Sequence, residues 1–107
     1  MNLIKENIIF LQAVATLSKK QVKELLKHAE KGQIRAIGEI AKNVLTNNLR
    51  PPESYKAVMK KHRWAIRAIA EDRAAHRVRL QTIVRKPDAV SYMIRVVLDK
   101  LTALTKQ

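Results

Sequence analysis

The chain has 107 residues, of which 47% are hydrophobic, and a net charge of +13 at neutral pH. This length and apolar content predict one folded domain over residues 1–107 and argue against a disordered chain. The sequence has two Gly and three Pro, which leaves few turn residues, and no Cys, which excludes disulfides and cysteine metal sites. We therefore expect an all-α protein, a compact bundle of about five or six short helices.

Hydrophobic spacing predicts two helices at the beginning of the chain. The first runs from Leu3 to about Ala15 and is apolar almost all round, which is typical of a centrally buried helix or a subunit contact. The second begins after Ser18, because Ser18 and Gln21 have the spacing of a capping box. Val22 then opens an apolar face with the i, i+3, i+4, i+7 repeat of a helix.

A third helix is predicted from Gln33 to about Asn47. Gly32 is expected to follow the end of the second helix, where a glycine often terminates the helical turn. Gly38 lies on or near the inward face of the third helix. Since glycine destabilises a helix interior, its presence there indicates a close approach by a neighbouring helix.

A fourth helix, from about Pro52 to Ala70, separates an apolar face from a basic one. Its apolar side carries Tyr55, Val58, Met59, Ile66 and Ile69. Four cations fall within an arc of about 60° on another side, and we call them the cationic ridge: Lys56, Lys60, Arg63 and Arg67. No acid lies among these cations, so an anionic partner would relieve their mutual repulsion. The alternative is a basic face that only contacts water.

Two further helices are expected before the end of the chain. One runs from Ala74 to Val84, with anchors at Val78, Leu80 and Ile83. The other is an amphipathic helix over about 88–104, capped by Asp88, with the stripe Val90, Met93, Ile94, Val97, Leu98, Leu101 and Leu104. This stripe either completes the core or forms the contact of a homodimer.

Positive charge is concentrated in residues 50–86. This segment holds eleven Lys and Arg against three acids, which accounts for eight of the 13 net charges. Such an excess predicts nucleic-acid binding by phosphate contacts, for which the candidates are Lys56, Lys60, Lys61, Arg63, Arg67, Arg73, Arg77 and Arg79. Trp64 lies beside the ridge and could stack on a base. Alternatively, it packs beneath a neighbouring segment.

No catalytic residue, metal site or cofactor is predicted. The histidines are His28, His62 and His76, and they form no metal-binding motif. We expect His62 to be a core histidine, because it falls on the apolar side of the fourth helix. No apolar run is long enough to span a bilayer. A helix lying on a membrane surface is a competing interpretation, although the apolar faces of successive helices can bury each other.

The chain resembles short basic proteins of Maverick/Polinton-type elements and their adenovirus-like viral relatives. The resemblance follows Met1–Asn7, Phe10-Leu11, Lys20-Gln21, Leu25–Lys27, Ala41, Asn43–Leu45, the proline turn, Lys61–Arg63 and Ala68–Ala70, and it fades near Arg85. It implies a virion core protein that condenses a genome. The chain departs from the family after Arg85, where an amphipathic helix replaces a Gly-Gly and an apolar tail, which puts any tail function in doubt.

These patterns lead to one functional expectation and an alternative. We expect a non-enzymatic protein that binds or condenses nucleic acid and acts inside the cell, in a nucleus or virion, without being secreted. The residues do not distinguish DNA from RNA, and double-stranded DNA is the partner expected from the resemblance. The alternative is a helical interaction module that self-associates or binds an acidic protein. A histone-like pairing module is disfavoured, because no long central helix lies between two short ones.

Overall fold

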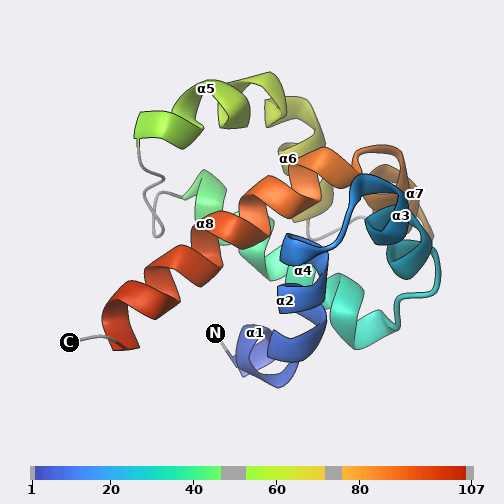
Figure 1. Cartoon of the computed structure of the whole chain (residues 1–107). Coiled ribbons are helices and arrows are strands. Elements are labelled where there is room, and N and C mark those ends of the chain that lie inside the picture. Colours follow the sequence, from blue (N-terminus) through green and yellow to red (C-terminus); the bar gives the residue numbers. More distant parts are fainter. Residues whose placement is uncertain (1, 47–52, 72–75, 106–107) are drawn as a thin grey trace.

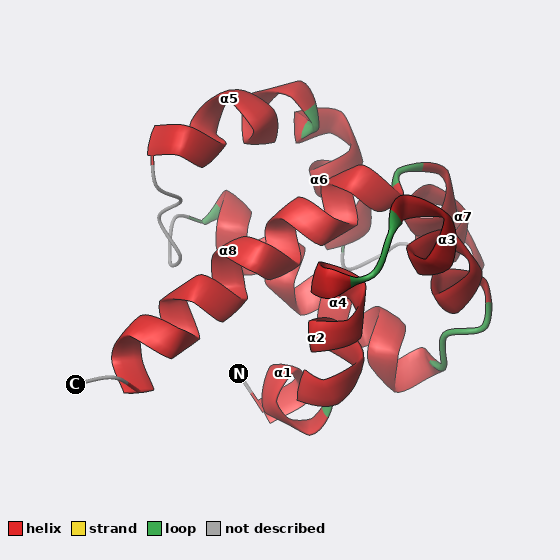
Figure 2. Cartoon of the chain, in the orientation of Figure 1, coloured by secondary structure: helices red, strands yellow, loops and turns green. Residues whose placement is uncertain are grey.

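The computed structural model describes residues 2–46, 53–71 and 76–105 (Figure 1). Within these ranges the backbone forms helices and short connections and no strand (Figure 2). The expected all-α fold is confirmed. The helices are, in chain order, α1 (Asn2–Glu6), α2 (Ile8–Thr16), α3 (Lys19–Lys27), α4 (Lys31–Leu45), α5 (Glu53–Lys61), α6 (Arg63–Ala70), α7 (His76–Arg85) and α8 (Pro87–Thr105).

The described residues form eight helices, more than expected, because two predicted helices are each divided. The helix predicted from Leu3 to Ala15 breaks at Asn7, whose Nδ2 donates to the Leu3 carbonyl oxygen at 2.7 Å. A continuing helix would give that carbonyl to the Asn7 backbone N–H, which bonds instead to the Ile4 carbonyl at 3.2 Å. After the break, Ile9 is 81% exposed. Central burial of this segment is therefore wrong at Ile9, and the alternative of a subunit contact there stays a prediction.

The helix predicted from Pro52 to Ala70 is divided at His62 into α5 and α6. His62 leaves the helical conformation, with φ −100° and ψ 12°, and its ring stacks on Tyr92 of α8 with the centroids 6.1 Å apart. With this break, α5 lies against α8 while α6 packs against α4 (Figure 1). The two halves of the predicted helix thus cover different parts of the core.

The helix ends agree with the sequence in one place and differ in two. The capping box is confirmed, because Ser18 Oγ accepts from the Gln21 N–H at 3.3 Å and Gln21 Oε1 accepts from the Ser18 N–H at 3.1 Å. Gly32 does not follow the second helix but lies in the first turn of α4. Asp88 likewise lies inside the first turn of α8, after Pro87, whose missing N–H suits the first helical position.

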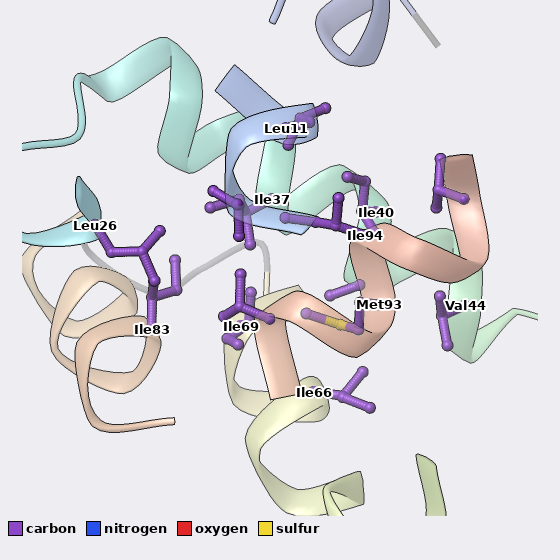
Figure 3. Close-up of a cluster of buried hydrophobic side chains, with 14 of the residues drawn as sticks. Leu11, Leu26, Ile37, Ile40, Val44, Ile66, Ile69, Ile83, Met93 and Ile94 are labelled. Carbon is purple, nitrogen blue, oxygen red and sulfur yellow. The ribbon is translucent and has the colours of Figure 1, made fainter. Parts of the chain in front are cut away.

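The core is built around α4 and α8, which contact each other and together contact every other described helix (Figure 1). Their buried side chains meet those of the surrounding helices in one apolar cluster (Figure 3). The stripe of α8 is buried from Val90 to Val97, so this part completes the core. The side chains of Leu101 and Leu104 lie outside the described residues.

In α7, Ile83 is buried as expected, but Val78 is 52% exposed and is not an anchor.

Two side chains of α8 hold the C-terminal end of α2. The last carbonyls of a helix have no partner within that helix and need donors from elsewhere. Ser91 Oγ donates to the Val14 carbonyl oxygen at 3.4 Å, and Arg95 Nε donates to the Ala15 carbonyl oxygen at 3.1 Å. The Arg95 charge also suits the negative end of the α2 dipole. α8 therefore fixes α2 by polar as well as apolar contacts.

The close approach predicted at Gly38 is present, but the neighbour is a side chain and not a helix backbone. A Cβ at Gly38 would lie 3.1 to 3.3 Å from the guanidinium of Arg79 on α7. That guanidinium is held in place, because its Nη2 donates to the Glu71 carbonyl oxygen at 2.7 Å, at the end of α6. Gly38 thus makes room for a cation that links three helices.

Alanine substitutions at the two glycines should have different effects on stability. At Gly32 an added Cβ meets nothing within 4 Å, so Gly32→Ala should raise the free energy of unfolding by about 0.5 kcal/mol through helix propensity. At Gly38 the same gain should be offset by displacement of the Arg79 guanidinium. Urea unfolding followed by circular dichroism measures both. Equal stabilisation by the two substitutions would contradict this account of Gly38.

Candidate nucleic-acid interface

The cationic ridge spans α5 and α6, and all four of its side chains are exposed. Lys56, Lys60 and Arg63 line one hollow with a volume of about 210 Å³, which we call the ridge hollow. Arg67 lines a second hollow of about 410 Å³. The break at His62 therefore leaves three of the ridge cations around one opening, although they come from two helices.

Apolar side chains line the ridge hollow, and three of them, Val44, Met59 and Ile66, are buried and form its floor. Val44 and Leu45 come from the end of α4, Met59 from α5 and Ile66 from α6. Lysine and arginine can lay their aliphatic stems along such a surface while their charged ends stay in water. The hollow thus combines a cationic rim with an apolar floor, which suits a ligand that has anionic groups next to apolar faces.

The second hollow adjoins the ridge hollow, because Leu45 lines both. It brings Lys42 of α4 next to Arg67, with Glu71 also in its wall. Lys42 is not among the cations predicted from the sequence, which were taken from the charge excess of residues 50–86. Its position in the last turn of α4, where the helix dipole favours a cation, was the signal that could have found it.

Trp64 is 70% exposed. The interpretation that it packs beneath a neighbouring segment is therefore wrong. In α6 the apolar contacts with the core are made by Ala65, Ile66 and Ile69, all of which are buried. Trp64 lies on the exposed side of the same helix, between Arg63 and Arg67 in sequence. Its indole is accessible to a ligand on the surface that bears the cationic ridge.

The other predicted cations do not join the ridge hollow. Lys61 lines a different hollow next to α8, and Arg77 is exposed on α7. Arg79 is half-buried, and its guanidinium contacts α4 and the end of α6 as described above. Arg73 lies outside the described residues. The candidate interface therefore consists of the ridge, Lys42 and Trp64.

His62 is half-buried between α5 and α8. Burial lowers the pKa of its imidazole below the ordinary value, and the charge of Lys61 acts in the same direction. Asp88 opposes the shift and Lys86 adds to it, both with smaller effects. The imidazole is consequently neutral at physiological pH, so the charge of the interface comes from Lys and Arg.

No group of three His, Asp or Glu side chains within the described residues could hold a metal ion. None of the helices they form is both long and apolar enough to cross a membrane.

No protein-family model, no curated protein and no solved structure matches this chain. The function of the interface is therefore inferred from its residues and geometry.

Replacing His62 with Gln should reduce the dependence of stability on pH. Because the pKa of His62 is lower in the folded than in the unfolded chain, the unfolded chain takes up the proton first as the pH falls. His62 thus contributes stability that is fully present above the unfolded-state pKa of about 6.5 and is lost as the pH falls through that value toward the lower pKa of the folded chain. Urea unfolding at several pH values should show a smaller loss for His62→Gln than for the wild type. An equal loss of stability in both proteins would contradict the lowered pKa of His62.

Proposed function

We propose that this protein binds nucleic acid without sequence preference, through the cationic ridge and the adjoining Lys42. The observation that carries the proposal is the grouping of Lys56, Lys60 and Arg63 around one hollow, next to Arg67 and an exposed Trp64. Sequence spacing alone placed these cations on one helix. Their positions on two helices around an apolar floor support binding of a ligand more than a merely solvated basic face.

The chemistry of the interface fits a nucleic-acid backbone. Lysine and arginine neutralise phosphates and release the counterions condensed on the strand, which gives an affinity that falls steeply with salt. Arg63 and Arg67 can also donate two parallel hydrogen bonds to one phosphate. No Asn or Gln lies between Lys56 and Arg67 to read base edges. The expected contacts are therefore with phosphates and, through Trp64, with bases irrespective of their identity.

The proposal extends to the condensation of double-stranded DNA. A net charge of +13 in 107 residues would neutralise much of the backbone charge of a bound duplex. The resemblance to proteins of Maverick/Polinton-type elements supports a role in packing a genome into a particle. On this proposal the protein has no catalytic role, and it acts where the genome is packed, in a nucleus or virion.

The alternative, an assembly module, loses part of its expected contact surface. Val90, Met93, Ile94 and Val97 are buried within the chain and cannot contact a second copy. A homodimer through this stripe would have to use its remaining residues, Leu98, Leu101 and Leu104. Because this apolar surface is reduced, nucleic-acid binding is better supported than self-association through α8, whereas an acidic protein would bind the same cations.

Changing the four ridge cations to Gln should weaken DNA binding and its dependence on salt. If the wild type contacts about six phosphates, log K should fall with log salt concentration at a slope of about −5, and the variant should retain a slope of about −2. Fluorescence anisotropy of labelled random-sequence duplex DNA measures both slopes.

A matched control separates the ridge from total charge. The control changes four other exposed cations, on α3 and the first half of α4, to Gln: Lys20, Lys23, Lys31 and Arg35. Both variants lose the same net charge, but the control should keep the wild-type slope. Equal weakening by the two variants would reject the ridge as the site, and affinity independent of salt would reject the proposed function.

The fluorescence of Trp64 should report base stacking directly, because it is the only tryptophan of the chain. A single-stranded oligonucleotide that stacks a base on the exposed indole should quench its emission. Heparin, a polyanion without bases, should bind the cations without that quenching. Unchanged emission at oligonucleotide concentrations that saturate the anisotropy signal would remove Trp64 from the interface.

A further inference from the structure

A separate polar pocket lies beside the C-terminal end of α5. It has a volume of about 360 Å³, which is within the range of small-ligand sites. Residues from the start of α3, the end of α5 and the first half of α8 line it, and it shares no residue with the ridge hollow. Its lining consists of Leu17, Lys19, Lys61, His62, Asp88, Ser91, Tyr92 and Arg95.

Positive charge dominates this pocket. Three cations, Lys19, Lys61 and Arg95, face a single carboxylate among the described lining residues, that of Asp88. Lys19 Nζ lies 3.3 Å from Asp88 Oδ2, so this ion pair satisfies the carboxylate. An excess of two positive charges remains. A doubly negative group would neutralise it.

Arg95 is fixed in position before any ligand arrives. Its Nε donates to the Ala15 carbonyl oxygen at 3.1 Å, and its guanidinium carbon lies 5.8 Å from the centroid of the Tyr92 ring. The bond through Nε directs one edge of the guanidinium toward α2 and leaves the terminal nitrogens as the donors for other partners. A planar, pre-oriented guanidinium is well suited to bind phosphate.

Aromatic rings form another part of the wall. The rings of His62 and Tyr92 stack at an interplanar angle of 28°, and both residues are half-buried, so part of each ring is accessible. The imidazole is neutral at physiological pH, as shown above, and can contact a nucleobase without the cost of desolvating a charge. The pocket therefore places an aromatic surface next to three cations.

We propose that this pocket binds the phosphomonoester of a nucleotide, with the phosphate on Lys61 and Arg95 and the nucleoside against His62 and Tyr92. This inference goes beyond the proposed function, which uses the ridge hollow and needs no terminal phosphate. Two sources present the same chemistry: a free mononucleotide, and the 5′-phosphate at the end of a nucleic-acid strand. A phosphodiester inside a strand carries one negative charge instead of two, so it neutralises the two excess positive charges of the pocket less completely.

The adjacent lysines Lys60 and Lys61 provide a matched pair for the test. Lys60 lines the ridge hollow and Lys61 lines the pocket, and both are exposed. Changing either lysine to Gln removes one positive charge, and the two positions are adjacent in the sequence. Arg95 is unsuitable, because its substitution would also release the end of α2. Circular dichroism should confirm that both variants are folded.

The first measurement uses the full chain, and follows backbone amide chemical shifts during titration with deoxyadenosine monophosphate or deoxyadenosine. The nucleotide should shift the amides around Lys61, Tyr92 and Arg95, and the nucleoside should not. Lys61→Gln should weaken nucleotide binding about tenfold, as expected for loss of a charge-assisted hydrogen bond. Lys60→Gln should leave the affinity measured at the Tyr92 and Arg95 amides unchanged, because Lys60 lines the ridge hollow and not the pocket. Equal shifts from nucleotide and nucleoside, or equal weakening by both variants, would overturn the proposal.

The second measurement distinguishes the two sources by comparing a single-stranded oligonucleotide with and without a 5′-phosphate. Lys60→Gln should weaken both strands, because Lys60 belongs to the ridge, but it should keep the ratio of their affinities. A preference for the phosphorylated strand that is lost in Lys61→Gln and kept in Lys60→Gln would support a strand end as the ligand. Binding of the mononucleotide without such a preference would support a free nucleotide. An acidic peptide that occupies the pocket more tightly than the mononucleotide would overturn the proposal. If the pocket does not bind nucleotides, duplex binding by the ridge should still depend on salt. Failure of this proposal is therefore distinguishable from failure of the proposed function.

Discussion

The apolar face of α8 formed by Val90, Met93, Ile94 and Val97 is fully buried, and α2 to α7 all pack against this helix. A face of this kind cannot remain in water without a large loss of hydrophobic stabilisation. Its coverage explains the arrangement of the other helices, since α5 lies on α8, α2 is tied to it by two hydrogen bonds, and α4 supplies the opposite side of the core. The ridge hollow is a product of the same packing, because its floor is formed where the ends of α4, α5 and α6 meet.

Helical periodicity and local capping made most of the fold predictable. The stripe of α8 and the box at Ser18 depend on residues close together in sequence, and both are present. The divisions at Asn7 and His62 were not predicted. The break at Asn7 accompanies a hydrogen bond from the Asn7 side chain to the backbone, which the sequence permits but does not require. The break at His62 accompanies a contact with Tyr92, which lies far along the chain. Periodicity carries no information on either choice.

The candidate interface was predictable in part for the same reason. Angular spacing grouped the ridge cations as if α5 and α6 were one helix. Lys56, Lys60 and Arg63 still line one hollow, although the break at His62 lies between Lys60 and Arg63. Lys42 could not be grouped with them from spacing, since it comes from another helix. Arg79 shows the opposite error. The sequence predicted that it contacts nucleic acid, but its guanidinium donates to a carbonyl group at the end of α6.

The hydrogen bonds from α8 to the end of α2 also bear on the order of folding. Ser91 and Arg95 reach carbonyl groups 77 and 80 residues earlier in the chain. Contacts with so large a sequence separation close long loops and form late. During synthesis α2 leaves the ribosome before α8, so it can contact α3 early but lacks the donors for its last carbonyl groups. The end of α2 is thus fixed only once α8 has been made, and until then the apolar side chains that α8 covers are open to chaperones or to another nascent chain.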